Sequence, residues 1–292
     1  MDLPHFSVVV PSYDRLRDLQ NCLASLAALE YPADRFEVIV VDDGSPSPVS
    51  AALSAPSPPF AMTVLRRARG GPAAARNTGL EAASGEFVAF TADDCRPRPD
   101  WLSALAARFA ADSSIAVGGR IVNQEVDNLY STSTDLLLRH LYEYYNAAIE
   151  DARFFTPNNL AFPLEALREM GGFRTEFVTG EDRELCDRWR IAGRRLVYAH
   201  DAVVDHRHPL DLAGFCHLHY RYGRGSRRFR QAAALRNSKA ADFEPISFYL
   251  GLIRYPLSRS HGARAIAISG LLCVAQLANA VGYLRQRFGP QL

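Results

Sequence analysis

Residues 38–45 read VIVVDDGS, a run of β-branched residues that stops at two aspartates, a glycine and a serine. Such a run is typical of a buried strand, and its ending is typical of a turn. A similar apolar run precedes it at residues 6–10, and two more follow at residues 63–65 and 87–90. Between the first two runs, leucines recur at helical spacing over residues 16–29. We therefore predict that strands alternate with helices.

This alternation continues through predicted helices at residues 73–83 and 101–111 to a further strand at residues 115–122. It predicts an α/β fold: a mostly parallel, twisted sheet flanked by helices. Such sheets bind ligands at the carboxyl ends of their strands. Polar residues follow three of the predicted strands, namely Ser12, Tyr13 and Arg15, then Asp42 and Asp43, then Asp93 and Asp94. The sequence therefore predicts a ligand site at this edge of the sheet.

The 292-residue chain is 48% hydrophobic and 22% charged, with a net charge of +1. This composition excludes a mainly disordered, collagen-like or coiled-coil protein, and the balanced charge predicts no nucleic-acid partner. The five cysteines form no Cys-x-x-Cys pair, which predicts free thiols in a reducing compartment. The N-terminus lacks the basic region of a signal peptide, so we expect a cytoplasmic catalytic part. No Gly-x-Gly-x-x-Gly motif follows the first strand, which argues against a nicotinamide enzyme.

A series of motifs resembles the family 2 glycosyltransferases, which have the GT-A fold. In order, they are VVVPSYDR (8–15), VIVVDDGS (38–45), GGPAAARNTGL (70–80), GEFVAFTADDCRPRPDWL (85–102), NNLAF (158–162), GGF (171–173) and GEDRELCDRWR (180–190). The resemblance implies a GT-A-like domain over residues 1–225. It also implies transfer of a sugar from a nucleoside diphosphate sugar, with a UDP-sugar favoured.

The resemblance also implies a nucleotide pocket at the strand ends. Asp43 is expected to accept a hydrogen bond from the base, and Arg76 to lie near the uracil or the diphosphate. Without the motif, Arg76 would be interpreted as a solvated helix charge and Tyr13 as a packed aromatic ring. The implied nucleotide-sugar-binding residues are Pro11, Tyr13, Arg15, Asp43, Arg76, Asn77, Asp93 and Asn159.

An Asp-x-Asp element holds a divalent cation in this family, and TADD (91–94) stands at its position here. Ala92 replaces the first aspartate of the commoner form, which removes one ligand. The resemblance implies that Asp94 contacts Mn²⁺ or Mg²⁺ and that Asp93 meets the ribose or a water. His206 is expected to complete the metal shell. Alternatively, His206 and His208, which share one face of a strand, donate hydrogen bonds to the diphosphate.

Glu181 and Asp182 open a predicted helix at residues 181–191. Carboxylates are structurally ordinary there, because the helix dipole stabilises them. The surrounding motif implies instead that Asp182 is the general base that takes the proton of the acceptor hydroxyl. Glu181 would orient the acceptor or the base. One carboxylate suffices for a single displacement, so the resemblance implies inversion at the anomeric carbon.

The C-terminal part differs in composition. We predict helices at residues 129–148 and 246–255, the second of which stops at Pro256. Between residues 206 and 239, seven arginines and one lysine are accompanied by a single acid, Asp211. Residues 265–284 carry no charge and are numerous enough to cross a bilayer.

We therefore expect residues 226–292 to form a basic linker and apolar helices that contact a membrane surface, at the cytoplasmic face of the inner membrane. The alternative for residues 265–284 is a buried helix or an oligomer interface. The acceptor is expected to be a cell-envelope glycan or a lipid-linked molecule. Alternative functions are a non-catalytic nucleotide-sugar-binding relative, because Ala92 weakens the metal element, and a sugar nucleotidyltransferase. No oligomeric state follows from the sequence.

Overall fold

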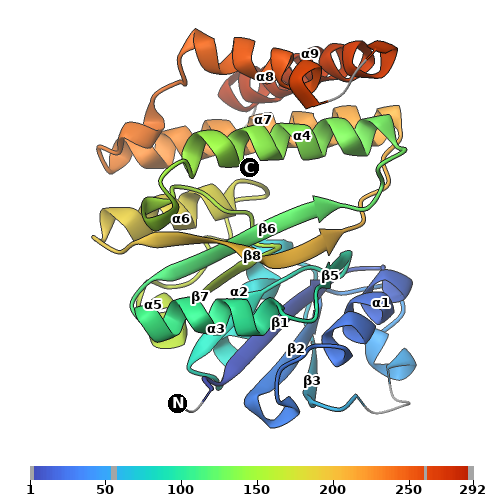
Figure 1. Ribbon diagram of the computed structural model, residues 1–292, viewed down its shortest axis with the longest axis vertical. Helices are drawn as coiled ribbons and strands as arrows, with labels where there is room; N and C mark the ends of the chain where they lie inside the picture. The colour runs from blue at the N-terminus through green and yellow to red at the C-terminus, as the bar shows by residue number, and fades with distance from the viewer. Residues whose placement is uncertain (1–2, 54–57, 260–261, 289–292) are drawn as a thin grey trace.

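Over residues 3–53, 58–259 and 262–288, which the computed structural model describes, the strands form one eight-stranded sheet (Figure 1). The strand order is β3-β2-β1-β4-β7-β6-β8-β5. The strands are β1 (Phe6–Ser12), β2 (Phe36–Asp42), β3 (Ala61–Arg66), β4 (Phe87–Phe90), β5 (Cys95–Pro97), β6 (Ala116–Asn123), β7 (Leu160–Pro163) and β8 (Leu196–His206). The short strands β5 and β7 were not predicted.

The sheet has a parallel half and a mixed half. β3, β2, β1 and β4 pair in parallel, as do β6 and β8. β7 runs antiparallel to both β4 and β6, and β5 runs antiparallel to β8. Parallel pairings therefore outnumber antiparallel ones, and the predicted mostly parallel sheet is confirmed.

Helices cover both faces of the sheet, with α1 and α3 on one face and α2, α5 and α6 on the other. The α-helices of the described residues are α1 (Leu16–Ala27), α2 (Pro72–Ala82), α3 (Trp101–Ala111), α4 (Leu129–Tyr145), α5 (Leu164–Glu169), α6 (Glu181–Ile191), α7 (Leu212–Leu235), α8 (Ile246–Arg259) and α9 (Gly262–Phe288). Alternate residues of β1 point to opposite faces. Val8 and Val10 pack into the core beneath α1 and α3, whereas Val9 packs into the core beneath α2, α5 and α6. Burial on both faces explains why the strands are continuously apolar.

The C-terminal helices form a separate layer. In Figure 1, α4 and α7 lie across the sheet, and α8 and α9 lie beyond them. α9 packs along α7 and also contacts α4 and α8. Its segment Gly262–Gln286 is long and apolar enough to cross a membrane, by length and composition only. The predicted apolar C-terminal appendage is confirmed as these helices.

Three glycines allow close approach around α7. A Cβ atom on Gly223 would lie 1.9 Å from the carbonyl oxygen of Asn279 in α9, and one on Gly282 would lie 2.0 Å from that of Tyr220 in α7. A Cβ atom on Gly225 would lie 2.3 Å from the carbonyl oxygen of Thr179. The backbone of α7 is therefore in direct contact with α9 on one side and with the loop that precedes α6 on the other.

The structure differs from two expectations about this region. The expected boundary between residues 225 and 226 falls inside α7, because the arginine-rich segment continues the helix. Arg230 is buried and pairs with Glu244, and Arg236 pairs with Glu184, so these two charges stabilise the helix packing. Pro256 does not end its helix: α8 continues to Arg259 and buries the proline.

Candidate active site

A cavity of about 1080 Å³ opens at the carboxyl ends of β1, β2 and β4 and extends beneath α4 and α7. The predicted site residues that line it are Pro11, Tyr13, Arg15, Asp43, Arg76, Asp93, Asp94, Glu181, Asp182 and His206. They come from segments far apart in the sequence, and the sheet brings them together because its parallel strands end at one edge. The predicted residues therefore lie together at one edge of the sheet, and the ligand itself stays a prediction.

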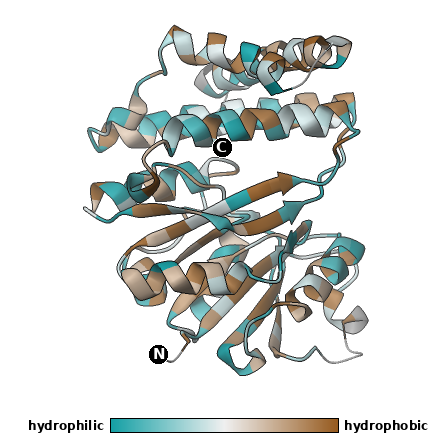
Figure 2. Ribbon diagram, viewed as in Figure 1, coloured by the Kyte–Doolittle hydropathy of each residue, from teal (hydrophilic) through white to brown (hydrophobic). Residues whose placement is uncertain are grey.

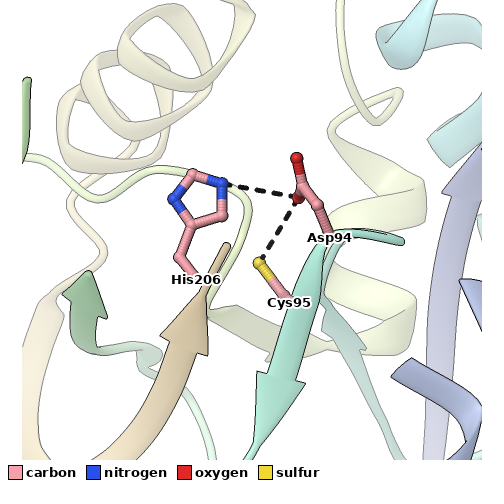
Figure 3. A group of neighbouring side chains, drawn as sticks. All are labelled: Asp94, Cys95 and His206. Carbon is pink, nitrogen blue, oxygen red and sulfur yellow. Dashed lines mark hydrogen bonds and ion pairs between the residues drawn. The ribbon is translucent and has the colours of Figure 1, made fainter. Parts of the chain in front are cut away.

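Asp94 lies at the centre of a cluster of donors (Figure 3). Its Oδ1 atom lies 3.4 Å from Nε2 of His206, and its Oδ2 atom lies 3.6 Å from Nδ1 of His208 and 2.7 Å from Nη1 of Arg15. Burial alone would raise the pKa of Asp94, but the two histidines and Arg15 hold it well below its usual range. Asp94 is therefore a carboxylate at neutral pH.

The donors around Asp94 fit a divalent cation. One ligand atom each from Asp94, Cys95 and His206 lie within 4.8 Å of one another (Figure 3). Carboxylate oxygen and imidazole nitrogen are ordinary ligands of divalent metals. Burial raises the pKa of the Cys95 thiol well above its usual value, so this sulfur stays protonated and is a poor ligand. Asp94 and His206 are the residues that fit, with His208 beside them.

Ser12 and Arg15 both contact the carboxylate of Asp93, the residue before Asp94. Ser12 Oγ donates to Asp93 Oδ2 at 2.9 Å, and Arg15 Nη1 lies 3.4 Å from Asp93 Oδ1. Burial, followed by the charge of Asp94, raises the pKa of Asp93 to about 6. Arg15 therefore balances two adjacent acids and points at them, not at open space in the cavity.

Asp43 fixes a loop at the rim of the cavity. Its carboxylate accepts hydrogen bonds from the backbone N–H groups of Gly70 and Gly71 and from Arg67 Nη1 at 2.8 Å. The same loop places the guanidinium of Arg69 over the ring of Tyr13, 4.1 Å from its centroid. Tyr13 thus presents a ring that is already stacked on one side, and Asp43 has much of its accepting capacity in use.

Asp182, in the first turn of α6, also lines the cavity. Glu181, its neighbour, accepts a hydrogen bond from Arg76 Nη1 at 2.9 Å. Asp182 Oδ1 accepts only the N–H of Arg183, at 2.7 Å, among the hydrogen bonds found in the described residues. Burial and then the charge of Glu181 raise the pKa of Asp182 well above its usual range. A raised pKa suits a carboxylate that must accept a proton.

Comparison with known families agrees with this geometry. Residues 7–171 match the family model described as glycosyl transferase family 2. The chain belongs to this family. It is a glycosyltransferase, as its named relatives are.

Two named relatives illustrate the similarity. The glycosyltransferase is 27% identical over 211 residues to glycosyltransferase AglE of Haloferax volcanii, across 70% of this chain and 67% of that protein. It is 34% identical over 223 residues to the pre-mycofactocin glycosyltransferase of Mycobacterium tuberculosis, across 70% of this chain and 43% of that one. The chain therefore spans less than half of the second relative.

Solved structures share the fold. The mannosyltransferase PcManGT of Pyrobaculum calidifontis, in complex with GDP-Man and Mn²⁺, has a TM-score of 0.65 at 21% identity, across 96% of this chain and 88% of that one. Residues 1–349 of Staphylococcus aureus TarS, in complex with UDP-GlcNAc, give 0.61 at 17% identity, across 97% and 90%. The glycosyltransferase thus has a GT-A-type fold, as expected.

Two predicted site residues of the glycosyltransferase do not line the cavity. Asn159 is fully buried, and its amide bonds to Trp101 Nε1 and to the carbonyl oxygens of Arg120 and Ala202. Asn77 accepts from the N–H of Phe173 and donates to its carbonyl oxygen. Both amides tie backbone segments together in this structure, and neither side chain lines the cavity where the donor was expected.

Other cavity residues of the glycosyltransferase were not singled out from the sequence. Asp135 and Thr134 on α4, and His219 and Tyr222 on α7, line the cavity, as does Arg69. Burial lowers the pKa of His219 to about 4, so its ring is neutral at pH 7. Most of them lie on helices outside the family motifs.

Proposed function

We propose that the protein is an inverting glycosyltransferase that moves a sugar from a nucleoside diphosphate sugar to an acceptor hydroxyl. The observation that carries this proposal is that the Asp94–His206 cluster and the raised-pKa carboxylate of Asp182 line one cavity. The Asp94–His206 cluster suits a departing diphosphate, and the carboxylate of Asp182 suits an acceptor hydroxyl. A reaction between two bound substrates requires both in the same space.

Asp182 acts as the general base in this mechanism. Its carboxylate takes the proton of the acceptor hydroxyl as the hydroxyl oxygen forms a bond to the anomeric carbon. The bond from that carbon to the diphosphate breaks, and its electron pair leaves with the diphosphate. Because the oxygen attacks opposite to the leaving group, the configuration inverts. Glu181, neutralised by Arg76, positions the helix start that carries Asp182.

The donor lies between Tyr13, Asp43 and Asp94. Tyr13 offers a ring to the base, and Asp43 together with the loop at Gly70 and Gly71 forms the rim. UDP is the favoured nucleotide, although the structural neighbours were solved with GDP-Man and UDP-GlcNAc. A divalent cation held by Asp94 and His206 supplies positive charge to the diphosphate. The imidazole favours Mn²⁺ over Mg²⁺, which prefers oxygen ligands.

The acceptor belongs to a cell-envelope glycan or is lipid-linked, and the protein acts at the cytoplasmic face of the inner membrane. The helices from Leu212 onward form the acceptor side of the protein. Exposed apolar side chains on α9, including Ile266, Leu277 and Val281, support contact with a membrane surface. Arg254 of α8 and Arg285 of α9 add charge that suits anionic lipid.

Thermal unfolding with nucleotides tests this function. The protein is heated with UDP, GDP, dTDP or CMP, with and without Mn²⁺, alongside the variant Asp94→Ala. A ligand that binds only the folded state raises its melting temperature. We expect one nucleotide, with Mn²⁺, to raise it in the wild type and not in Asp94→Ala. The exposed Asp201→Ala is the matched control, and it should respond as the wild type does.

A second candidate, a nucleotide-sugar-binding protein without catalysis, is favoured by Ala92 alone. It makes a different prediction: nucleotide binding persists, but no sugar reaches any acceptor. Turnover of a donor with an acceptor rules it out. The absence of any nucleotide effect on a folded sample contradicts the transferase proposal itself.

A further inference from the structure

A second cavity, of about 490 Å³, adjoins the larger cavity that Asp182 lines. The residues that line both spaces are Tyr145, Phe154, Arg183 and Phe229. We call the second space the side cavity. Its walls come from the end of α4, from α6, from α7 and from the segment that follows α7. Arg183 follows Asp182 directly in the chain, so a group bound in the side cavity lies close to a hydroxyl at Asp182.

The side cavity is rich in positive charge. Among the described residues that line it, the charged ones are Arg153, Arg183, Arg190, Lys239 and Asp187. Both oxygens of Asp187 are already in use, because Oδ2 lies 2.8 Å from Arg236 Nη2 and Oδ1 accepts a hydrogen bond from Ser238 Oγ at 2.6 Å. The acid is therefore neutralised from outside the cavity, and the basic residues determine what the cavity attracts.

Several of these basic groups have unused binding capacity. Arg190 Nη2 lies 3.3 Å from the exposed Asp151, but Arg190 Nε is buried and has no hydrogen-bond partner in the described residues. Arg153 and Lys239 are exposed, and neither forms an ion pair within the part of the chain that the structure describes. The guanidinium of Arg153 lies over the ring of Tyr145, 5.3 Å from its centroid. These cations are therefore available to an anion that enters.

Arg183 lies at the boundary between the two cavities. Its Nη2 atom lies 3.1 Å from the hydroxyl of Tyr145 and 3.5 Å from Glu244 Oε1. Glu244 is shared with Arg230, whose Nη2 atom lies 2.7 Å from Oε2. Because one carboxylate contacts two guanidinium groups, the boundary keeps positive charge as well.

Aromatic rings complete the side cavity. Tyr145, Phe154 and Phe229 line it, and the Arg183 guanidinium lies 4.7 Å from the centroid of the Phe229 ring. Figure 2 shows hydrophilic residues on α6 and on the end of α7 that lies beside it. Ring faces pack against the C–H groups of a sugar, and the planar arginine fork matches a phosphate or a carboxylate. The side cavity therefore suits a sugar that carries an oxyanion.

We propose that the side cavity binds an oxyanion of the acceptor, a phosphate or a carboxylate on the sugar unit at the reacting hydroxyl or next to it. This inference rests on the proposed function, and it specifies the acceptor class as an anionic glycan. Arg153, Arg190 and Lys239 hold the anion, while Asp182 takes the proton of the hydroxyl. Holding the acceptor at two points orients its hydroxyl for attack.

Sugars with and without a charged group test this inference. Binding of D-glucose, D-glucose 6-phosphate, D-glucuronate and inorganic phosphate is measured by titration calorimetry. UDP and Mn²⁺ are present to fill the donor site, and blank titrations without protein correct for Mn²⁺ bound by phosphate. We expect at least one charged sugar to bind about tenfold or more tightly than D-glucose, because charge-assisted hydrogen bonds are the strong ones.

The order of affinities identifies the anion. Tighter binding of D-glucose 6-phosphate than of D-glucuronate assigns a phosphate, and the reverse order assigns a carboxylate. If neither charged sugar binds more tightly than D-glucose, the inference is overturned. It is also overturned if inorganic phosphate binds as tightly as the better charged sugar, because the site then takes a free anion and not part of an acceptor.

Matched substitutions locate the anion. Arg190→Gln and the double variant Arg153→Gln/Lys239→Gln should each weaken binding of the better charged sugar about tenfold and leave D-glucose unaffected. Arg108→Gln is the control, because Arg108 lines neither cavity, is 32% exposed against 33% for Arg190, and likewise pairs with an exposed aspartate. Wild-type affinity in both test variants would place the anion elsewhere and refute the inference.

A third readout separates this inference from the proposed function. The substituted residues do not line the larger cavity, so each variant should keep the melting-temperature rise with UDP and Mn²⁺. Its retention shows that the fold and the donor site are intact. If the rise is absent in the wild type, the proposed function fails. If the rise is present but charge on the sugar does not strengthen binding, the function stands and the anionic acceptor is refuted.

Discussion

Arg76 and Glu181 form a buried ion pair: Arg76 Nη1 lies 2.9 Å from Glu181 Oε1, and only 6% and 8% of the two side chains are exposed. The pair joins α2 to the first residue of α6. It neutralises Glu181 beside Asp182, for whose carboxylate the described residues provide no ion pair. Two adjacent acids therefore have different environments, one held by an arginine and one left free to take a proton.

Replacing Asp182 by asparagine should remove the general base. We expect Asp182→Asn to lower the rate of sugar transfer by about 10²- to 10⁴-fold, the usual contribution of such a group. The melting-temperature response to nucleotide should be unchanged, because Asp182 does not hold the donor. The exposed Asp201→Asn is the matched control. Full transfer activity in Asp182→Asn would show that another group takes the proton.

The pH dependence of transfer should reflect the environment of Asp182. Burial and Glu181 raise its pKa, so the protonated, inactive form persists to a higher pH than for an exposed aspartate. We expect the rate to rise with pH through this pKa and then level off. In Glu181→Gln one negative charge is lost, and the rising limb should move to lower pH. An unmoved limb in pH–rate profiles of kcat would assign that ionisation to a different group.

Removing a metal ligand should raise the Mn²⁺ requirement. We expect His206→Ala to need at least about tenfold more Mn²⁺ than the wild type for half-maximal activity. Even residues that only hydrogen-bond to a metal ligand change metal affinity by about this factor when they are replaced. His206→Gln keeps a polar side chain of similar length and serves as a comparison. His217, which is exposed on α7, gives the control variant His217→Ala. If His206→Ala needs no more Mn²⁺ than the wild type, His206 does not bind the metal together with Asp94.

The close contact of α7 with α9 should not tolerate a methyl group. Gly282→Ala places a Cβ atom 2.0 Å from the carbonyl oxygen of Tyr220, and we expect it to destabilise the protein by about 1–3 kcal/mol. Gly270→Ala lies on the same helix with open space around it, and the better helix propensity of alanine should stabilise it by up to about 1 kcal/mol. Denaturant unfolding of both variants gives the comparison. Equal free energies of unfolding for Gly282→Ala and Gly270→Ala would mean that α7 and α9 move apart at little cost.

Local patterns in the sequence predicted most of the sheet and its ligand edge. Runs such as residues 38–41 are apolar on both faces, and Asp43, Asp93 and Asp94 follow strands, so their shared edge is a consequence of parallel pairing. The helix at Glu181 was predicted with the bounds it has in the structure. These features depend on residues close together in the chain.

The sequence could not predict which side chains form hydrogen bonds or ion pairs with one another, because these pairs depend on packing between distant segments. The motif containing Asn159 indicates a functional amide, yet three buried groups occupy that amide. Arg76 was expected near the uracil or the diphosphate, and its partner Glu181 lies 105 residues away in sequence. The arginines between residues 206 and 239 make this segment basic in composition. Only the structure shows that Arg230 pairs with Glu244 and that Arg236 pairs with Glu184.

The pairing of β5 with β8 determines whether the Asp94 cluster exists at all. Cys95 lies opposite His206, and the N–H of Arg207 donates to the carbonyl oxygen of Asp94. An irregularity in the β6–β8 pairing sets this alignment, since Gly119 pairs with Ala199 but the next residue, Arg120, pairs with Val203. A one-residue slip of β8 would turn His206 to the opposite face while every amino acid of the site remained in the chain. The length of this strand is therefore as much a part of the site as its side chains, and a single inserted residue would erase the cluster without a substitution.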